Sequence, residues 1–584
     1  MSSKHFINDP THLVLSALKS ITLTNPTTAL DEENKIVYLR PDAAKQQVSI
    51  ISGGGSGHEP SFAAFVGPGL LSGAVAGTIF ASPGAEQVRR CIGERVETGK
   101  GVLVVVMNYT GDVLNFGMAV EKAKAAGVQV EMVVMGDDAG VGRAQGGKVG
   151  RRGIAGTVLV HKIAGALAAE GAELKDVHRV AKTVAENTVS IGSSLMHVHV
   201  PGREAGGEEE LGQSEVEIGM GIHNEPGSEK SKEDLPGIVK RMLKYMLDQS
   251  DKDRAFSNIS SSNETVLLVN NLGGVSVLEM GGITTEVVNQ LQQTYSIKPV
   301  RIISGTFMTS LNGLGFSLSL LKLQDTGVSK SMLELLDAPA EASGWSAAVK
   351  SSTWANPPTK TRDAGSGSTG QNKPCGISID PKQADKALRN ALRKLIAAEP
   401  DITKYDTVVG DGDCGIGLKR GAEGILSYLD EGKNEQDAAL FLDGIISVVE
   451  KTMDGTSGAL YAIFLNALAG GIRQQGSSSS QSADPAIWAK ALKAALDAMS
   501  KYTPAQPGDR TLVDALQPFV ETLEKSKSVD EAAKAAEQGS AKTKGMKASL
   551  GRTVYVGGSG FEEVPDPGAH GLAVFFKGLG EGLD

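Results

Sequence analysis

The stretch VSIISGGGSGHEP, residues 48–60, decides the fold of the first half of the chain. An apolar, β-branched run passes without a break into a cluster of glycines. Such a cluster at the carboxyl end of a parallel strand is where open α/β sheets bind ligands. It is not a Walker A loop, because no Gly-Lys-Ser/Thr follows, and His58 stands where a nucleophile elbow needs its second glycine. We predict a backbone cradle for a small, oxygen-rich ligand ending at His58, with a purely structural tight turn as the alternative.

Further apolar runs in the first half have the length and composition of buried strands. They are VLVVVM (102–107), VEMVVM (130–135), TVLLVN (265–270) and VRIIS (300–304). Helix-period segments at 86–97 and 116–127 lie between several of them. This alternation predicts an N-terminal α/β domain, residues 1–338, with mixed or mostly parallel sheets covered on both faces. If the domain has two subdomains, they divide near residue 190.

The pattern changes after residue 338. Residues 339–376 are rich in Pro, Ser, Gly and Thr without a sustained period, which predicts a flexible linker. Beyond it, apolar residues recur every three or four positions in the segments 382–400, 435–453, 486–502 and 529–546. We therefore expect residues 377–584 to form an all-helical domain, with a polar loop at 476–482.

The bulk composition of the 584-residue chain excludes several classes of protein. A net charge of −10 and an aromatic content of 4% argue against a nucleic-acid partner. No window of about 18 consecutive apolar residues appears, and the first 20 residues lack the pattern of a secretory signal, so we expect no membrane partner. Three sparse cysteines favour a reducing compartment. We expect a cytoplasmic protein.

Three aspartates are crowded into YDTVVGDGDCG, residues 405–415. Asp406, Asp411 and Asp413 would repel one another without a cation among them, so they predict a site for a hard divalent metal. An EF-hand loop starting at Asp411 would need Gly and Glu where Ile416 and Ala422 stand, which excludes it. A solvated acidic turn is the remaining alternative.

Two motifs of the first half offer acid–base residues. NYTGD, residues 108–112, follows a predicted strand and places Asp112 at the same sheet edge as His58. Asp112 could equally cap a helix that starts near Phe116. GMGIHNEPG, residues 219–227, places His223 in a glycine-flanked loop, where a lone histidine is more often incidental than catalytic.

Three polar turns of the second half suit helix N-termini that meet phosphate. They are DGTSGA (454–459), GDRTLVDAL (508–516) and PDPGAH (565–570). Each is weak evidence by itself.

Together and in this order, the motifs resemble those of the dihydroxyacetone (glycerone) kinase family, in its single-chain, ATP-dependent fungal form. The resemblance covers essentially the whole chain and includes VGRRGIAGTVLVHK (149–162), LVNNLGG (268–274) and GTFMTSLNG (305–313). It implies a kinase that phosphorylates dihydroxyacetone, and D-glyceraldehyde as well. The α/β half would bind the triose, and the second half, a barrel of helices, would bind Mg²⁺ and ATP.

The resemblance also assigns roles to residues. His223 would bond the substrate carbonyl as a hemiaminal, Asp112 would take the proton of the attacking hydroxyl, and His58 would assist as acid or base. The triose would be bound by Gly55, Ser56, Gly57, His58, Met107 and Asp112. Asp406, Asp411 and Asp413 would hold Mg²⁺. The nucleotide would be surrounded by Gly415, Ile416, Gly417, Leu418, Thr456, Ser457, Arg510, Thr511, Asp566, Pro567 and Gly568.

One departure and two alternatives accompany this resemblance. Many relatives have Lys where Met107 precedes NYTGD, and methionine donates no hydrogen bond, so we expect substrate affinity or the preferred triose to differ here. The family implies a homodimer whose active site is built between subunits. Animal relatives also cyclise FAD at the nucleotide site, and some bacterial relatives are regulators without catalysis, so a lyase and a regulator are the other functions to test.

Overall fold

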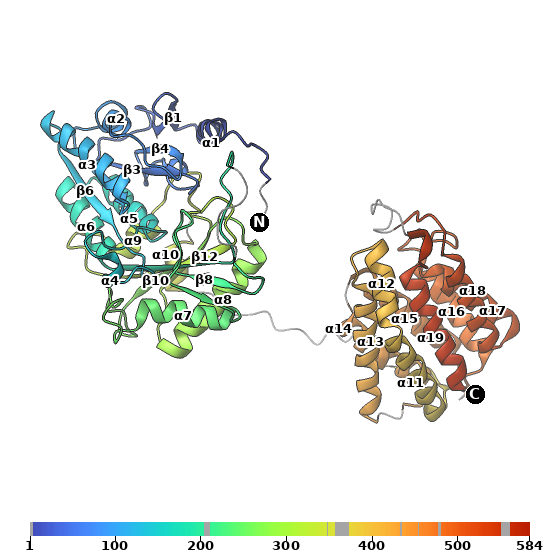
Figure 1. Ribbon diagram of the computed structural model, residues 1–584. Coiled ribbons are helices and arrows are strands. Elements are labelled where there is room, and N and C mark those ends of the chain that lie inside the picture. The colour runs from blue at the N-terminus through green and yellow to red at the C-terminus, as the bar shows by residue number, and fades with distance from the viewer. Residues whose placement is uncertain are drawn as a thin grey trace. The chain divides into compact units, whose positions relative to one another are not determined.

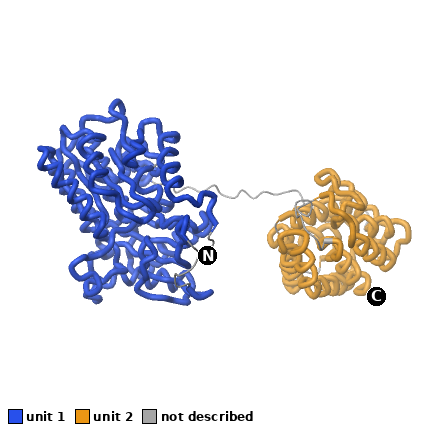
Figure 2. The backbone as a smooth tube through the Cα atoms, turned by 45° about the horizontal axis from the view of Figure 1, so that its top comes forward, with its two compact units in different colours: residues 1–360 blue, residues 361–584 orange. Residues whose placement is uncertain are grey.

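The computed structural model describes residues 4–203, 211–346, 349–356, 373–432, 435–453, 455–476, 481–550 and 561–583. The chain forms two compact units, residues 1–360 and 361–584, coloured separately in Figure 2. Residues 347–348 and 357–372 of the predicted linker, and residues 477–480 of the predicted polar loop, lie outside the described residues.

The first unit contains a six-stranded sheet in the order β1-β2-β4-β3-β5-β6 (Figure 1). Its strands are β1 (Thr28–Asp31), β2 (Ile36–Leu39), β3 (Ser49–Ser56), β4 (Gly73–Ile79), β5 (Val102–Met107) and β6 (Val130–Met135). β4, β3, β5 and β6 are parallel, whereas β1 and β2 join as an antiparallel edge. Three of these strands coincide with the predicted apolar runs, because strands buried on both faces are continuously apolar.

A second six-stranded sheet has the order β11-β10-β12-β7-β8-β9. Its strands are β7 (Thr188–Ser194), β8 (Val216–Ile218), β9 (Glu229–Ser231), β10 (Thr265–Asn271), β11 (Arg301–Gly305) and β12 (Gly315–Lys322). Only β10 and β11 pair in parallel; the other neighbours are antiparallel. The mixed sheets of the prediction are confirmed. The first strand of this sheet, β7, begins close to residue 190, where the sequence analysis placed a possible division into subdomains. The strand order was not predicted, because apolar runs carry no information about which strand is their neighbour.

Helices cover both sheets. Those of the first unit are α1 (Pro10–Thr24), α2 (Ala85–Arg90), α3 (Thr110–Ala125), α4 (Arg143–Gly146), α5 (Thr157–Ala169), α6 (Leu174–Glu186), α7 (Leu235–Leu247), α8 (Val277–Tyr295), α9 (Met332–Asp337) and α10 (Ser351–Ala355). Short 3-10 and π segments lie at Ala63–Phe65 and Cys91–Arg95. α2 and α3 pack on one face of the first sheet, and α7 and α8 on the outer face of the second.

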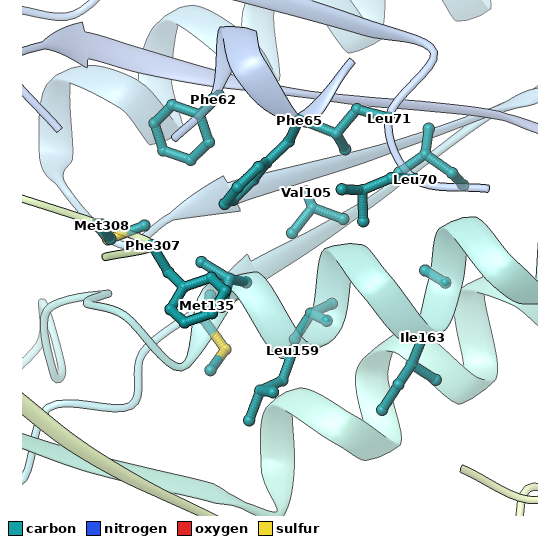
Figure 3. Close-up of a cluster of buried hydrophobic side chains, with 14 of the residues drawn as sticks. Phe62, Phe65, Leu70, Leu71, Val105, Met135, Leu159, Ile163, Phe307 and Met308 are labelled. Carbon is teal, nitrogen blue, oxygen red and sulfur yellow. The ribbon is translucent and has the colours of Figure 1, made fainter. Parts of the chain in front are cut away.

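One hydrophobic core joins the two sheets, and Figure 3 shows part of it. Val105 of the first sheet and Leu268 of the second belong to this core, together with Leu159 and Ile163 of α5. α5 is buried along nearly its whole length and is mostly apolar, with His161 and Lys162 as buried polar residues in its middle, as expected for a helix that lies between layers. Each fully buried large side chain contributes about 1.5–3 kcal/mol, so this core fixes the two sheets as one unit.

The predicted linker begins too early. Glu341 N donates to Pro68 O, and Gly344 N donates to Ala64 O, both at 2.9 Å. Trp345 packs against Phe65 with ring centroids 6.1 Å apart. These residues belong to the first unit, because an aromatic side chain and paired backbone groups outweigh the local Pro/Ser/Gly composition.

The second unit is helical, as predicted. Its helices are α11 (Pro381–Ala397), α12 (Glu399–Val409), α13 (Cys414–Asp430), α14 (Ala438–Thr452), α15 (Gly455–Gln475), α16 (Pro485–Met499), α17 (Val513–Ser526), α18 (Val529–Lys542) and α19 (Pro567–Leu583), with a 3-10 turn at Phe561–Glu563. A two-residue strand pair joins β13 (Ile377–Ser378) and β14 (Gln481–Ser482). In Figure 1 the helices stand side by side, and contacts run from α11 through α13–α19 back to α11, which closes a ring.

By length and composition alone, α15 is apolar enough to cross a membrane. It contacts α14 and α16 within the helical ring, and Phe464, Leu468 and Ile472 are buried in the core of the unit. A core helix of this kind passes the same hydropathy test as a membrane span.

Candidate active site

The strand order of the first sheet brings two predicted motifs together. β3 and β5 are parallel neighbours, so the segments that follow them leave the sheet at the same edge. β3 leads into Gly57 and His58, and β5 leads into Tyr109 and the first turn of α3, which carries Asp112. The predicted proximity of the two motifs follows from this pairing.

His58 is fully buried and held on both ring nitrogens. Its Nδ1 lies 2.8 Å from Thr309 O, which can only accept, so Nδ1 carries the proton. Its Nε2 lies 3.0 Å from Nε2 of His223. Burial, together with the nearby charge of His223, lowers the pKa of His58 to about 3. His58 is therefore a neutral imidazole whose Nε2 accepts a proton from its neighbour.

His223 lies in the loop between β8 and β9, inside a frame of aromatic rings. Its ring makes edge contacts with Tyr109, His58 and Phe80, with centroids 4.6, 4.8 and 5.2 Å away. The side chain retains 18% of its exposure, so one side of the ring is open to a ligand. The structure thus brings together His58 and His223, residues 165 positions apart in the sequence.

Asp112 is buried in the first turn of α3, and its Oδ1 has no hydrogen-bond partner among the described residues. The helix begins at Thr110 with Tyr109 as its N-cap, so the alternative that Asp112 caps a helix near Phe116 is wrong. Burial raises the pKa of Asp112 above 3.8, while a hydrogen bond with Ser82 and the charge of His223 oppose the shift. A buried carboxylate oxygen without a partner is a candidate base.

The residues of the predicted glycine cradle lie where the end of β3 packs closely against the segment that follows β4. Gly57 has φ +107°, and a Cβ there would lie 2.7 Å from the ring of Phe80. A Cβ on Gly55 would lie 2.7 Å from Ala81 N. Ser56 donates its hydroxyl to Gly77 O at 3.0 Å, so this side chain holds the turn. Residues 55–57 therefore let the backbone and the Phe80 ring approach His58 closely.

Met107 lies away from the polar groups. It is the last residue of β5, is 1% exposed, and belongs to the core between the sheets. A Cβ on Gly153 would lie 2.8 Å from the Cβ of Met107, so the backbone at Gly153 packs directly against Met107. Its side chain packs in the hydrophobic core.

In the second unit, Asp406, Asp411 and Asp413 offer carboxylate oxygens that all lie within 4.8 Å of one another. Asp406 is in the last turn of α12, and the other two are in the loop before α13. Three converging carboxylates are the ligand type that Mg²⁺ prefers, so the donor set fits the implied metal. Asp406 Oδ2 also accepts from Cys414 N at 3.0 Å, which ties the cluster to the start of α13.

The start of α13 is packed closely on α12. A Cβ on Gly415 would lie 2.3 Å from Thr403 Oγ1 and 2.7 Å from Glu399 O, so only glycine fits there. Leu418 is buried in the core, whereas Ile416 is exposed next to the aspartates. The unpaired N–H groups of this helix N-terminus favour an anion such as phosphate beside the metal.

The remaining predicted nucleotide residues fall into two groups. Thr456 and Ser457 lie in the first turn of α15 rather than in a turn before it, and Pro567 and Gly568 open α19. Arg510 is 3% exposed and donates to Thr543 O and Val564 O, so its guanidinium holds two loops.

Other groups shape the loops around the cluster. Thr511 N donates to Asp514 at 2.8 Å, which folds the turn before α17. Burial, with Asp514 and Asp406 adding negative charge, raises the pKa of Asp566 to about 7. The negative potential that Asp406 extends to Asp566 is what a bound cation would relieve.

Comparisons with known proteins cover both units. The Dak1 domain model matches residues 19–344, and the DAK2 domain model matches residues 408–581. The chain is 44% identical to dihydroxyacetone kinase 1 of Saccharomyces cerevisiae, over 100% of both chains. The chain belongs to the dihydroxyacetone kinase family. It is also 36% identical to the triokinase/FMN cyclase of Rattus norvegicus, over 100% of this chain and 99% of that one.

A solved structure supports the same family. The dihydroxyacetone kinase of C. freundii in complex with AMP-PNP and Mg²⁺ has 32% sequence identity and a TM-score of 0.65, and the match covers 99% of this chain and 100% of that one. The order of α/β unit and helical unit predicted from the sequence is confirmed.

Sequence reasoning missed four residues of this dihydroxyacetone kinase family member. They are Phe80, Tyr109, Glu225 and Thr309, all of which contact His58 or His223. Tyr109, Glu225 and Thr309 stood inside the quoted motifs, so their membership of those motifs was the available signal. Phe80 had none, because it follows β4, which was not predicted.

Proposed function

We propose that this protein is an ATP-dependent kinase that phosphorylates dihydroxyacetone, and D-glyceraldehyde as well. One observation carries the proposal, the combination of groups on a single chain. The His58–His223 contact and Asp112, whose Oδ1 has no partner among the described residues, lie at one edge of the first sheet, and three aspartates converge in the second unit. The full-length similarity to dihydroxyacetone kinases supports the same substrate.

The histidine pair suits covalent binding of a ketone. Nε2 of His223 would bond the carbonyl carbon as the C=O π bond opens, and the carbonyl oxygen would take up the proton that Nε2 of His223 gives to Nε2 of His58. The product is a hemiaminal. Glycerol has no carbonyl, so it would be rejected by reactivity rather than by shape.

Asp112 would be the general base. Its free Oδ1 would accept the proton of the triose hydroxyl as that oxygen attacks the γ-phosphorus of ATP. A buried carboxylate with a raised pKa is a stronger base than a solvated one. This step needs Asp112 ionised.

The second unit would present ATP. Asp406, Asp411 and Asp413 would hold Mg²⁺, which when bound neutralises phosphate charge and orients the γ-phosphoryl group. The N-terminus of α13 and the first turn of α15 would contact the phosphates through backbone N–H groups and the hydroxyls of Thr456 and Ser457.

A coupled assay of ADP release with dihydroxyacetone and Mg-ATP tests the proposal. We expect turnover that His223→Ala and Asp411→Ala each abolish, while both variants retain the wild-type circular dichroism spectrum. A flat signal from folded wild-type protein would contradict the kinase assignment.

A lyase activity is the second candidate function. It is favoured by the full-length similarity to a triokinase/FMN cyclase. Incubation with FAD and Mn²⁺ should release AMP and a cyclic flavin phosphate if the nucleotide site accepts FAD. Absence of the cyclic product would restrict this chain to the kinase reaction.

Assembly and location are part of the proposal. We infer a homodimer in which the triose site of one subunit receives the nucleotide of the other, and a cytoplasmic protein, supported by three free cysteines. A regulator without catalysis is disfavoured because the histidine pair, Asp112 and the aspartate cluster all occur on one chain.

A further inference from the structure

Glu225 stands two residues after His223 and binds it twice. Its Oε2 accepts from the backbone N–H of His223 at 2.9 Å, and its Oε1 lies 3.0 Å from Nδ1 of the ring. Each carboxylate oxygen thus meets one nitrogen of the same residue. Neither His58 nor Asp112 makes such a contact, and the chemistry described above does not use Glu225.

The contacts fix which nitrogen carries which proton. Burial would raise the pKa of Glu225, but the hydrogen bond and charge of His223, with the charge of Arg152, lower it to about 2. Glu225 is therefore a carboxylate, which can only accept, so Nδ1 of His223 is the donor. Nε2 is then the nitrogen that donates to Nε2 of His58, and it becomes available to a carbonyl carbon once His58 takes that proton.

Contacts from other segments of the first unit hold the loop that carries Glu225. Arg152 pairs with the buried Asp138 at 2.7 Å and donates to Gly219 O at 2.8 Å. A Cβ on Gly221 would lie 2.0 Å from Glu225 Oε2 and 2.6 Å from a guanidinium nitrogen of Arg152. The Glu225 carboxylate therefore packs against the backbone of Gly221, where no side chain would fit. Ser310 Oγ donates to Ile222 O at 2.7 Å. These contacts leave the carboxylate little freedom to turn away.

We propose that Glu225 is a positioning residue that holds one proton of His223 on Nδ1, so that release of the other proton from Nε2 to His58 makes Nε2 the nucleophile toward the substrate carbonyl. The inference rests on the proposed function for its consequence, but its premise concerns the ligand-free protein. As Nε2 of His223 passes its own proton to Nε2 of His58 and bonds the carbonyl carbon, the C=O π electrons pass to oxygen, which takes that proton from His58, and Nδ1 of His223 keeps its hydrogen throughout.

Glu225→Gln is the informative change because it preserves shape. Two donors converge on Glu225, and an amide has only one acceptor oxygen. The backbone N–H cannot change, so the amide oxygen should turn to it and the NH₂ group should face Nδ1. Nδ1 must then give up its proton to accept from the NH₂ group, which leaves the proton on Nε2 as the only one. Nε2 cannot pass that proton to His58 without leaving the ring as an imidazolate, which blocks attack on the carbonyl.

The experiment uses full-length protein with ¹⁵N-labelled histidine, in which a His223→Asn spectrum identifies the His223 signals among nine histidines. A second measurement follows carbonyl-labelled ¹³C-dihydroxyacetone, whose resonance moves from the ketone to the tetrahedral region when the adduct forms. Glu225→Asp retains an acceptor. Glu217→Gln is the matched control, because Glu217 pairs with His197 at 2.8 Å in the same neighbourhood without touching His223.

We expect Glu225→Gln to shift Nδ1 of His223 from the protonated to the unprotonated region and to abolish the adduct. We expect Glu225→Asp to restore part of it, and Glu217→Gln to keep both wild-type signals. An unchanged Nδ1 signal in Glu225→Gln, or a wild-type level of adduct, would overturn the inference. If wild-type protein forms no adduct, the covalent step of the proposed function fails, and the nitrogen spectra alone decide the role of Glu225.

Discussion

His58 and Asp112 show how burial prepares individual residues for proton transfer. Burial disfavours the charged form of each, so it lowers the pKa of His58 to about 3 and raises that of Asp112 above 3.8. His58 consequently remains neutral and able to receive a proton from His223. The raised pKa of Asp112 means that this carboxylate binds a proton more readily than a solvated aspartate does.

Asp112→Asn should lower kcat for dihydroxyacetone by about 10²–10⁴-fold, with little change in the Michaelis constant, because an amide cannot accept the hydroxyl proton. In wild-type enzyme, activity should fall as the pH decreases through a pKa above 3.8, since the protonated carboxyl is inactive as a base. The residual activity of the variant should lack this acidic limb. Glu121→Gln, an exposed change on the same helix, is the control. A variant with wild-type kcat would remove Asp112 from the chemistry.

The positions of functional residues could be predicted from the sequence, but the directions of some side chains could not. The histidine and aspartate positions could be predicted because polar groups follow strand ends and glycine turns. Met107 and Arg510 were predicted to face ligands, but their side chains lie in the core and against backbone carbonyls. A motif gives a residue's neighbourhood, whereas the direction of its side chain depends on packing from elements far away in the chain.

Gly415 controls the metal site at the scale of helices. α12 carries Asp406, and α13 begins directly after Asp413, so the spacing of these helices determines the distances within the aspartate cluster. A Cβ on Gly415 would overlap both a side chain and the Glu399 carbonyl of α12. Backbone cannot move aside as a flexible side chain can, so the helices would have to separate.

Gly415→Ala should weaken Mg²⁺-dependent ATP binding at least tenfold and destabilise the second unit by about 1–3 kcal/mol, as overpacked cores do. Isothermal titration with ATP and Mg²⁺ measures the first effect, and thermal unfolding the second. Gly470→Ala is the matched control, because no atom lies within 4 Å of its added Cβ. Unchanged nucleotide affinity in Gly415→Ala would mean that the helix spacing does not set the metal site.

Elements were predictable to the extent that their signals are local. Five apolar runs became β3, β5, β6, β10 and β11, and four amphipathic segments became α11, α14, α16 and α18. β7 and β12 were missed because serines interrupt their apolar residues. α3 starts at Thr110, six positions before the predicted start at Phe116. The residues Thr-Gly-Asp are typical of a turn, but they form the first turn of this helix. Pairing into two sheets depends on contacts between distant segments.

The whole molecule separates its two sets of functional groups. The histidine pair lies in the first unit and the aspartates in the second, so one phosphoryl transfer needs both units. The sequence predicted this division because the helical period replaces the strand pattern near residue 338. Which subunit supplies which site in the proposed homodimer is a separate matter.

Mixing His223→Ala chains with Asp411→Ala chains tests that arrangement. In a dimer with sites built between subunits, each mixed dimer contains one intact site, so reassociated protein should regain about a quarter of wild-type activity. Each variant alone should remain inactive. If the mixture stays inactive although subunit exchange is shown with tagged chains, each site is built within one chain.

The most direct test of the account is phosphate transfer from Mg-ATP to a matched pair of acceptors, dihydroxyacetone and glycerol, which differ only at the carbonyl that His223 would bond. The account predicts rapid transfer to dihydroxyacetone, no measurable transfer to glycerol, and loss of the dihydroxyacetone reaction in His223→Ala. Equal rates with both acceptors, or an active His223→Ala enzyme, would contradict it.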